Sequence, residues 1–162
     1  MLNPSFYTQT RVSILIITGG SKVYNKMDYK RGDKVEVVNN EEGFKGSFFP
    51  ANIISKVSDN EYIVQYRTLV KDDNSGPLRE VLSAKNIRPA PREIVASGFR
   101  LSESVDAYVE DGWWAAKVVG KSGSDYVVRF DNECEEKTYP LDLLRVHQDW
   151  KCKDGVWVFS GK

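Results

Sequence analysis

The chain has 162 residues, of which 41% are hydrophobic and 12% are aromatic. This composition excludes a fully disordered protein and supplies apolar side chains for one ordinary core or two small ones. Its 23 basic and 23 acidic side chains exclude the uniform positive field that drives non-specific binding to nucleic-acid phosphates.

Residues 1–27 differ in composition from the rest of the chain. Their apolar run, Val12–Ile17, is far shorter than the roughly 20 residues that a membrane-spanning helix needs. The run is also shorter than the apolar region of a typical signal peptide, which has about 7–15 residues. We therefore predict a disordered leader over residues 1–27 and no association with a membrane.

Residues 28–90 contain short runs in which apolar and polar residues alternate. The runs are centred on Val35–Val37, Phe49–Ile53 and Tyr62–Tyr66, and turn-forming residues separate them. A period of two is typical of half-buried β-strands, and no stretch of the sequence has a sustained helical period. We therefore predict an all-β fold.

The same order of runs returns, with matching spacing, in residues 98–150. The runs are Val105–Val109, Trp114–Val118 and Tyr126–Phe130, which indicates an internal duplication. We call residues 28–90 the first repeat and residues 98–150 the second repeat. Because the proline-containing joint Pro89–Glu93 is short, we expect the repeats to pack together. Residues 151–162 are expected to form a C-terminal tail.

The residues that could support catalysis are few. We expect Cys134 and Cys152 to be free thiols in a reducing compartment, because they lack the spacing of a zinc site. His147 is the only histidine, and we expect it to pack or to form hydrogen bonds rather than to act as a general base. The sequence therefore predicts a non-enzymatic protein with no cofactor and no metal.

Several motifs, in matching order, resemble the plant-type Agenet domain. They are Gly32–Val37, Gly46–Ala51, Tyr62–Tyr66 and Ile87–Pro89 in the first repeat, and Val105–Tyr108, Asp111–Trp114 and Tyr126–Phe130 in the second. Agenet domains belong to the Tudor-like, or Royal, group of small bent β-barrels. The resemblance implies two tandem Tudor-like barrels packed together, in a nuclear reader of methylated lysine. Tandem plant members of the family read histone H3 methylated at lysine nine.

Aromatic faces and a carboxylate suit a methylated ammonium, because it keeps its charge but has lost N–H donors. The resemblance places such a cage at one rim of the barrel. In the first repeat this rim would contain Phe44, Phe48, Phe49, Tyr66, Asp72 and Asp73. In the second repeat, the alternative, it would contain Tyr108, Trp113, Trp114, Phe130, Asp131 and Glu133. The longer loop of the first repeat, residues 40–47, favours the first repeat because it can reach over the rim.

The two members of each pair of adjacent aromatic residues cannot both pack into the same core. Phe48 and Phe49 must point to opposite faces of their strand, and so must Trp113 and Trp114. One member of each pair can fill a core, which is the commoner role of an aromatic residue on a strand. The other member belongs either to a cage or to a contact between the repeats.

The distribution of charge along the chain indicates which kind of partner the protein binds. Acidic side chains outnumber basic ones in the second repeat, whereas basic side chains gather at the two ends of the chain. A methylated histone H3 tail is therefore a better electrostatic partner than a nucleic-acid backbone, and other chromatin proteins are further candidates. The alternative is a protein-interaction or RNA-associated module like the fragile X tandem, whose aromatics would bind another peptide or stack on bases. A third reading is a folded scaffold that binds no mark.

Overall fold

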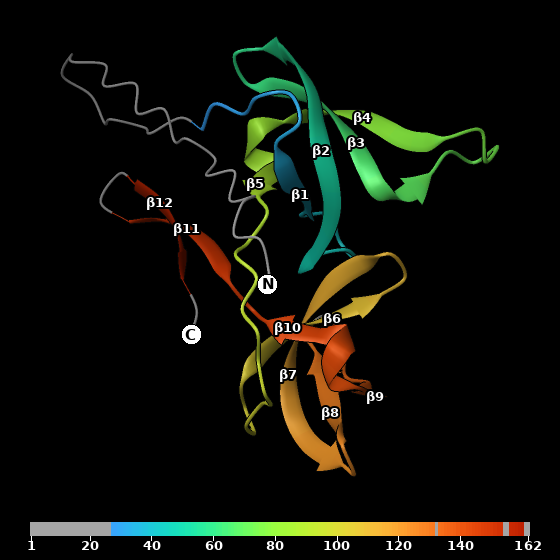
Figure 1. Ribbon diagram of the computed structural model, residues 1–162, viewed down its shortest axis with the longest axis vertical. Helices are drawn as coiled ribbons and strands as arrows, with labels where there is room; N and C mark the ends of the chain where they lie inside the picture. The colour runs from blue at the N-terminus through green and yellow to red at the C-terminus, as the bar shows by residue number, and fades with distance from the viewer. Residues whose placement is uncertain (1–26, 132, 154–155, 161–162) are drawn as a thin grey trace, which may run out of the picture.

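The computed structural model describes residues 27–131, 133–153 and 156–160, so the predicted leader lies outside the described residues except for Met27. Figure 1 shows two β-rich halves stacked end to end, with the first repeat above the second. In the described ranges the elements are strands and two short 3₁₀ turns, which confirms the all-β prediction. Within those ranges no helix is long and apolar enough to cross a membrane.

The first repeat is a five-stranded antiparallel sheet. Its strands are β1 (Lys34–Asn39), β2 (Ser47–Ser58), β3 (Glu61–Val70), β4 (Pro77–Ser83) and β5 (Ile87–Pro89), with the 3₁₀ turn η1 (Ala84–Asn86) before β5. They pair in the order β5–β1–β2–β3–β4. Register shifts between Ile53 and Ser55 and between Lys56 and Ser58 bend the long strand β2.

The second repeat has the same plan. Its strands are β6 (Ser104–Val109), β7 (Gly112–Ser122), β8 (Asp125–Phe130), β9 (Glu136–Tyr139) and β10 (Leu144–Val146), with the 3₁₀ turn η2 (Leu141–Leu143) before β10. They pair in the order β10–β6–β7–β8–β9, and a register shift between Val118 and Gly120 bends β7. The Tudor-like fold is thus confirmed. The sheets are open rather than closed barrels, because each end strand (β4, β5, β9 and β10) pairs with one neighbour in the ladders described.

Each repeat has its own hydrophobic core, built from the inward positions of the alternating runs. The first core contains Val35, Val37, Ala51, Ile53, Tyr62, Val64, Tyr66 and Ile87. The second contains Val105, Ala107, Ala116, Val118, Tyr126, Val128, Phe130 and Leu144. Met27 and Tyr29 are also buried in the first core, so the fold already includes the last residue of the predicted leader.

The duplication extends to a buried tyrosine hydroxyl on the third strand of each repeat. The Tyr62 hydroxyl accepts a hydrogen bond from the backbone N–H of Tyr29 at 3.3 Å, and the two ring centroids are 5.4 Å apart. The Tyr126 hydroxyl accepts one from the N–H of Phe99 at 3.3 Å, with centroids 5.7 Å apart. The same contact therefore fastens the segment leading into each repeat.

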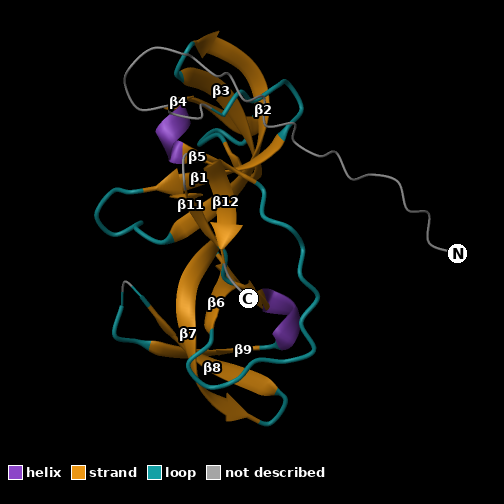
Figure 2. Ribbon diagram, turned by 90° about the vertical axis from the view of Figure 1, so that its left-hand side faces the viewer, coloured by secondary structure: helices purple, strands orange, loops and turns teal. Residues whose placement is uncertain are grey.

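The repeats join through their second strands. β2 pairs with β7 at Ser47–Trp114 and Phe48–Trp113, so the two sheets form one ten-stranded sheet and the repeats pack together as predicted. Where a C-terminal tail was expected, the described residues form a hairpin of β11 (Asp149–Lys153) and β12 (Val156–Ser160). Figure 2 shows this hairpin beside β1 and β5, and Trp150 packs against the first core.

Candidate functional site

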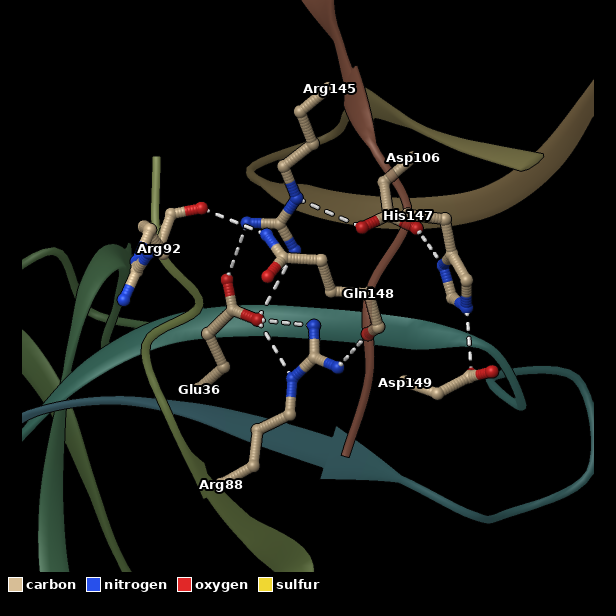
Figure 3. A network of polar contacts seen from close by, with 8 residues as sticks. All are labelled: Glu36, Arg88, Arg92, Asp106, Arg145, His147, Gln148 and Asp149. Atoms are coloured by element: carbon tan, nitrogen blue, oxygen red, sulfur yellow. Dashed lines mark hydrogen bonds and ion pairs between the residues drawn. The ribbon is translucent and has the colours of Figure 1, made fainter. Parts of the chain in front are cut away.

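Two repeat-equivalent ion pairs meet where the repeats join (Figure 3). Glu36 and Arg88 face each other across β1 and β5, and Asp106 and Arg145 face each other across β6 and β10. The Arg88 guanidinium donates to Glu36 at 3.0 and 2.7 Å, and Arg145 Nε donates to Asp106 at 2.9 Å. Arg145 also donates to Glu36 at 2.7 and 3.1 Å, which links the two pairs. The duplication has thus produced a single charge network at the junction.

Each arginine of this network lies over an aromatic ring. The Arg88 guanidinium carbon is 3.7 Å from the centroid of the Phe48 ring, and that of Arg145 is 4.3 Å from the Trp113 ring. Both distances are within the range of a cation–π contact. Because β2 pairs with β7 at these two positions, one member of each adjacent aromatic pair serves the contact between the repeats.

The other members of the aromatic pairs point away from this network. Phe49 packs against the first core and Trp114 against the second, and their rings meet edge to face at 6.3 Å. Gly112 is the residue that allows this approach, because a Cβ atom there would lie 2.6 Å from the Phe49 ring.

Three of the junction charges are almost completely withdrawn from water, whereas the side chain of Arg145 is 20% exposed. Glu36 and Arg88 are each 2% exposed and Asp106 is 0% exposed. Burial lowers the pKa of Arg88, and the attraction of Glu36 opposes that effect. Buried charges are tolerated when they are paired and hydrogen-bonded, as they are here. The network therefore joins the two repeats through the contact between Glu36 and Arg145.

His147 extends the network toward the C-terminal hairpin. Its Nδ1 lies 2.6 Å from a carboxylate oxygen of Asp106, and its Nε2 lies 2.9 Å from one of Asp149. The hydrogen bond to Asp106 raises the pKa of His147, and Asp149 adds to the effect. Next to it, the Gln148 carbonyl accepts from Arg88 at 2.8 Å and the Gln148 amide donates to the Arg92 carbonyl at 2.8 Å. His147 is thus a hydrogen-bonding residue of the junction, as the sequence predicted.

A pocket of about 140 Å³ opens on the second repeat, separate from the junction network. It is lined by Val109, Glu110, Trp114, Phe130, Glu133 and Lys137. The Trp114 indole N–H donates to the Val109 carbonyl at 3.2 Å, which fixes the plane of the ring. Phe130 is held edge to face by Tyr139, with centroids 6.0 Å apart. Trp114 and the small exposed part of Phe130, a core residue that is 4% exposed, therefore share one opening with two carboxylates.

Negative charge dominates the surroundings of this pocket. Burial raises the pKa of Tyr139; nearby Lys137 opposes that shift, whereas Glu133, Glu135 and Glu110 add to it. Within the described ranges, no group of three or more His, Cys, Asp or Glu side chains is arranged so that it could hold a metal ion. An aromatic, acidic pocket of this kind is suited to an organic cation.

The residues predicted for a cage in the first repeat are distributed over several places. Phe48 lies under Arg88 at the junction, and Phe49 packs against the first core. Tyr66 is 6% exposed, and its hydroxyl donates to Glu80 at 2.6 Å. Asp72 and Asp73 are exposed in the turn between β3 and β4, which Figure 1 shows projecting away from the junction.

Phe44, the remaining member of that set, lies next to the second repeat. Its ring centroid is 6.2 Å from that of Trp114, and its side chain is 46% exposed. The loop is held there by the Gly46 carbonyl, which accepts from the N–H of Ala115 at 2.9 Å. The long loop thus places Phe44 against Trp114 of the second repeat.

The set predicted for the second repeat is better assembled. Trp114, Phe130 and Glu133 line the pocket together. Trp113 lies under Arg145, and Tyr108 packs against Trp113 with centroids 5.1 Å apart, so both belong to the junction. Asp131 is exposed beside Phe130.

Sequence reasoning missed three residues of the pocket, Val109, Glu110 and Lys137. Glu110 lies in the tight turn between β6 and β7, where its φ of 47° turns the chain sharply. Lys137 is two residues before Tyr139 on β9, so the period of two could have placed both side chains on one face.

The chain is similar to known proteins over both repeats. The sequence profile of the Agenet domain matches residues 32–92 and 102–148. In Arabidopsis thaliana, Protein AGENET DOMAIN (AGD)-CONTAINING P1 is 37% identical over 145 residues, covering 87% of this chain and 27% of that protein. DUF724 domain-containing protein 3 of the same plant is 36% identical over 131 residues, covering 76% of this chain and 19% of that protein. The chain thus spans less than a third of the length of these relatives.

Two crystallised proteins share the tandem arrangement. Arabidopsis thaliana AGDP1 AGD34 superposes with a TM-score of 0.72 and 31% identity, covering 80% of this chain and 88% of that chain. The tandem Agenet domain 3-4 of ADCP1 has a TM-score of 0.68 and 28% identity, covering 80% of this chain and 86% of that chain. This coverage exceeds either repeat alone, so the likeness includes the way the repeats are joined.

Proposed function

Because the chain belongs to the Agenet family, a family of binding modules, we propose that it is a non-enzymatic reader of methylated lysine on a histone tail. We assign the reading site to the pocket of the second repeat. Histone H3 methylated at lysine nine is the first candidate ligand, since the family resemblance implies that mark. The observation that carries the proposal is the meeting of Trp114 and Phe130 with Glu110 and Glu133 in one pocket.

The chemistry of the pocket supports discrimination by methylation. An unmodified lysine ammonium is compact and strongly hydrated, so removing it from water costs more than it gains from an aromatic surface. Methylation weakens that hydration while keeping the charge, and each aromatic face then contributes about 0.5–2 kcal/mol. Glu110 and Glu133 supply the negative charge that a methylated ammonium still requires.

The charge around the pocket supports a basic tail as the partner. Besides the two lining carboxylates, Glu135 and Glu136 lie on the segment that leads into β9. A tail rich in lysine and arginine would be attracted to this surface, and the attraction would weaken as salt is added. A nuclear location follows from a histone ligand and is part of the proposal.

Calorimetric titration with histone H3 tail peptides tests this function. The peptides carry no, one, two or three methyl groups on lysine nine, and we expect the methylated forms to bind more tightly than the unmodified form. Glu133→Gln and Glu110→Gln should each weaken binding of the methylated peptide by about two- to five-fold. Because both side chains are exposed, the melting temperature should not change.

Asp72→Asn is the matched control, since it removes a carboxylate from the exposed turn between β3 and β4. It should leave affinity unchanged. If Asp72→Asn weakens binding while Glu133→Gln and Glu110→Gln do not, the first repeat carries the cage. Tight RNA binding that ignores methylation and falls steeply with salt would instead support the RNA-associated alternative.

A further inference from the structure

The pocket of the second repeat already faces a cation that belongs to the chain. Lys137 lines the pocket, and its Nζ is 5.9 Å from the centroid of the Phe130 ring. This distance is within the range of a cation–π contact. The pairing of Lys137 with Val128 across β8 and β9 makes Phe130 its diagonal neighbour, so the contact follows from the sheet register.

The same ammonium has a second partner outside the pocket lining. Lys137 Nζ lies 3.6 Å from a carboxylate oxygen of Glu135, and these two side chains are 44% and 66% exposed. A flexible lysine at this exposure can leave the ring and remain near a carboxylate in water. Lys137 is therefore partly exposed and contacts a carboxylate as well as the Phe130 ring.

We propose that Lys137 is a resident cation of the pocket that sets the affinity with which a methylated lysine enters. This inference rests on the proposed function. A ligand ammonium and Lys137 would compete for the small part of Phe130 that reaches the pocket, since the residue is 4% exposed, and two like charges so close together repel each other. Binding of the ligand therefore requires Lys137 to move away from the ring.

This competition has a definite thermodynamic form. If Lys137 covers the ring for part of the time, the apparent Kd of any ligand is its intrinsic Kd divided by the fraction of open pockets. That factor is the same for methylated and unmodified lysine. Lys137 therefore lowers every affinity by the same factor and leaves their ratio unchanged.

Lys137→Gln, compared with Lys121→Gln, tests the proposal in the full chain. Lys121 also belongs to the second repeat, and its Nζ is 5.5 Å from the Tyr126 ring, away from the pocket lining. Both substitutions remove one positive charge and one cation–π contact, so the net charge of the protein changes equally. Calorimetry with unmodified and methylated H3 peptides then isolates the effect of the pocket position.

We expect Lys137→Gln to bind both peptides about two- to five-fold more tightly than Lys121→Gln, by the same factor for each peptide. Lys137→Arg, which keeps a cation over the ring, should bind both peptides with the affinity of the protein that carries no substitution. If the protein without a substitution binds methylated peptide, and Lys137→Gln and Lys121→Gln bind it with equal affinity, this inference is wrong and the proposed function stands. If neither the protein nor any variant binds methylated peptide, the proposed function is wrong and this inference falls with it.

Discussion

The guanidinium of Arg145, in the second repeat, binds the carboxylate of Glu36, in the first, with Nη1 2.7 Å from Oε2. The two residues are 109 positions apart in the chain, so the contact exists only when the repeats are packed. Glu36 also accepts two hydrogen bonds from Arg88. One buried carboxylate therefore holds two arginines, one from each repeat.

Glu36→Gln should strongly destabilise the protein. The substitution leaves Arg88 and Arg145 in a buried site without their shared charge, and breaking a buried pair in this way costs about 3–5 kcal/mol. Urea denaturation measures the loss in the free energy of unfolding. Glu93→Gln, at an exposed position of the joint, is the control and should change stability by less than about 0.5 kcal/mol. If Glu36→Gln lowers the free energy of unfolding by less than about 1 kcal/mol, the loss is no larger than that of a surface ion pair. That result would contradict the role of Glu36 in holding the two arginines together.

Stability should fall as the pH rises above the ordinary pKa of histidine, 6.5. The hydrogen bond to Asp106 raises the pKa of His147 in the folded state, so folding favours the protonated ring. The protonated ring stabilises the fold fully when the pH is below the pKa of His147 in the unfolded chain. This stabilisation is lost as the pH rises through the higher pKa of His147 in the folded protein. Urea denaturation at a series of pH values from about 6 to about 9 should show this fall, and His147→Gln should remove it. The same slope in both proteins would show that another group causes it.

Gly112→Ala should disturb the contact between the repeats. The added Cβ would lie 2.6 Å from the Phe49 ring, and overpacking of this kind costs about 1–3 kcal/mol. Gly76→Ala is a matched control, because a Cβ there meets nothing within 4 Å. Thermal unfolding should show a clearly lower melting temperature for Gly112→Ala alone. Equal melting temperatures would mean that Phe49 moves aside at no cost.

Much of the fold follows from local pattern. The alternation around Val35, Val64, Val105 and Val128 placed these residues inward, and all four are 0% exposed. The adjacent aromatics at Phe48–Phe49 and Trp113–Trp114 also predicted two destinations for each pair. Both kinds of inference depend only on the period of two along a strand.

The candidate site was harder to predict because its parts come from segments far apart in the chain. The pairing of Phe48 with Trp113 turns these two rings toward the arginines, and no local signal gives that register. Loop length led to the prediction that Phe44 reaches over the rim of the first repeat, but its ring contacts Trp114 of the second repeat. Asp72 and Asp73 lie in a turn whose direction depends on the bend of the whole sheet.

Nuclear magnetic resonance with an H3 peptide dimethylated at lysine nine tests the central claim most directly. The indole N–H of Trp114 donates to the Val109 carbonyl at the pocket, so its resonance reports on the second-repeat site. We predict that this resonance and the amides of Phe130 and Lys137 shift with the methylated peptide and shift less with the unmodified one. Shifts confined to Tyr66, Asp72 and Asp73, or equal shifts with both peptides, would contradict a methyl-lysine site in the second repeat.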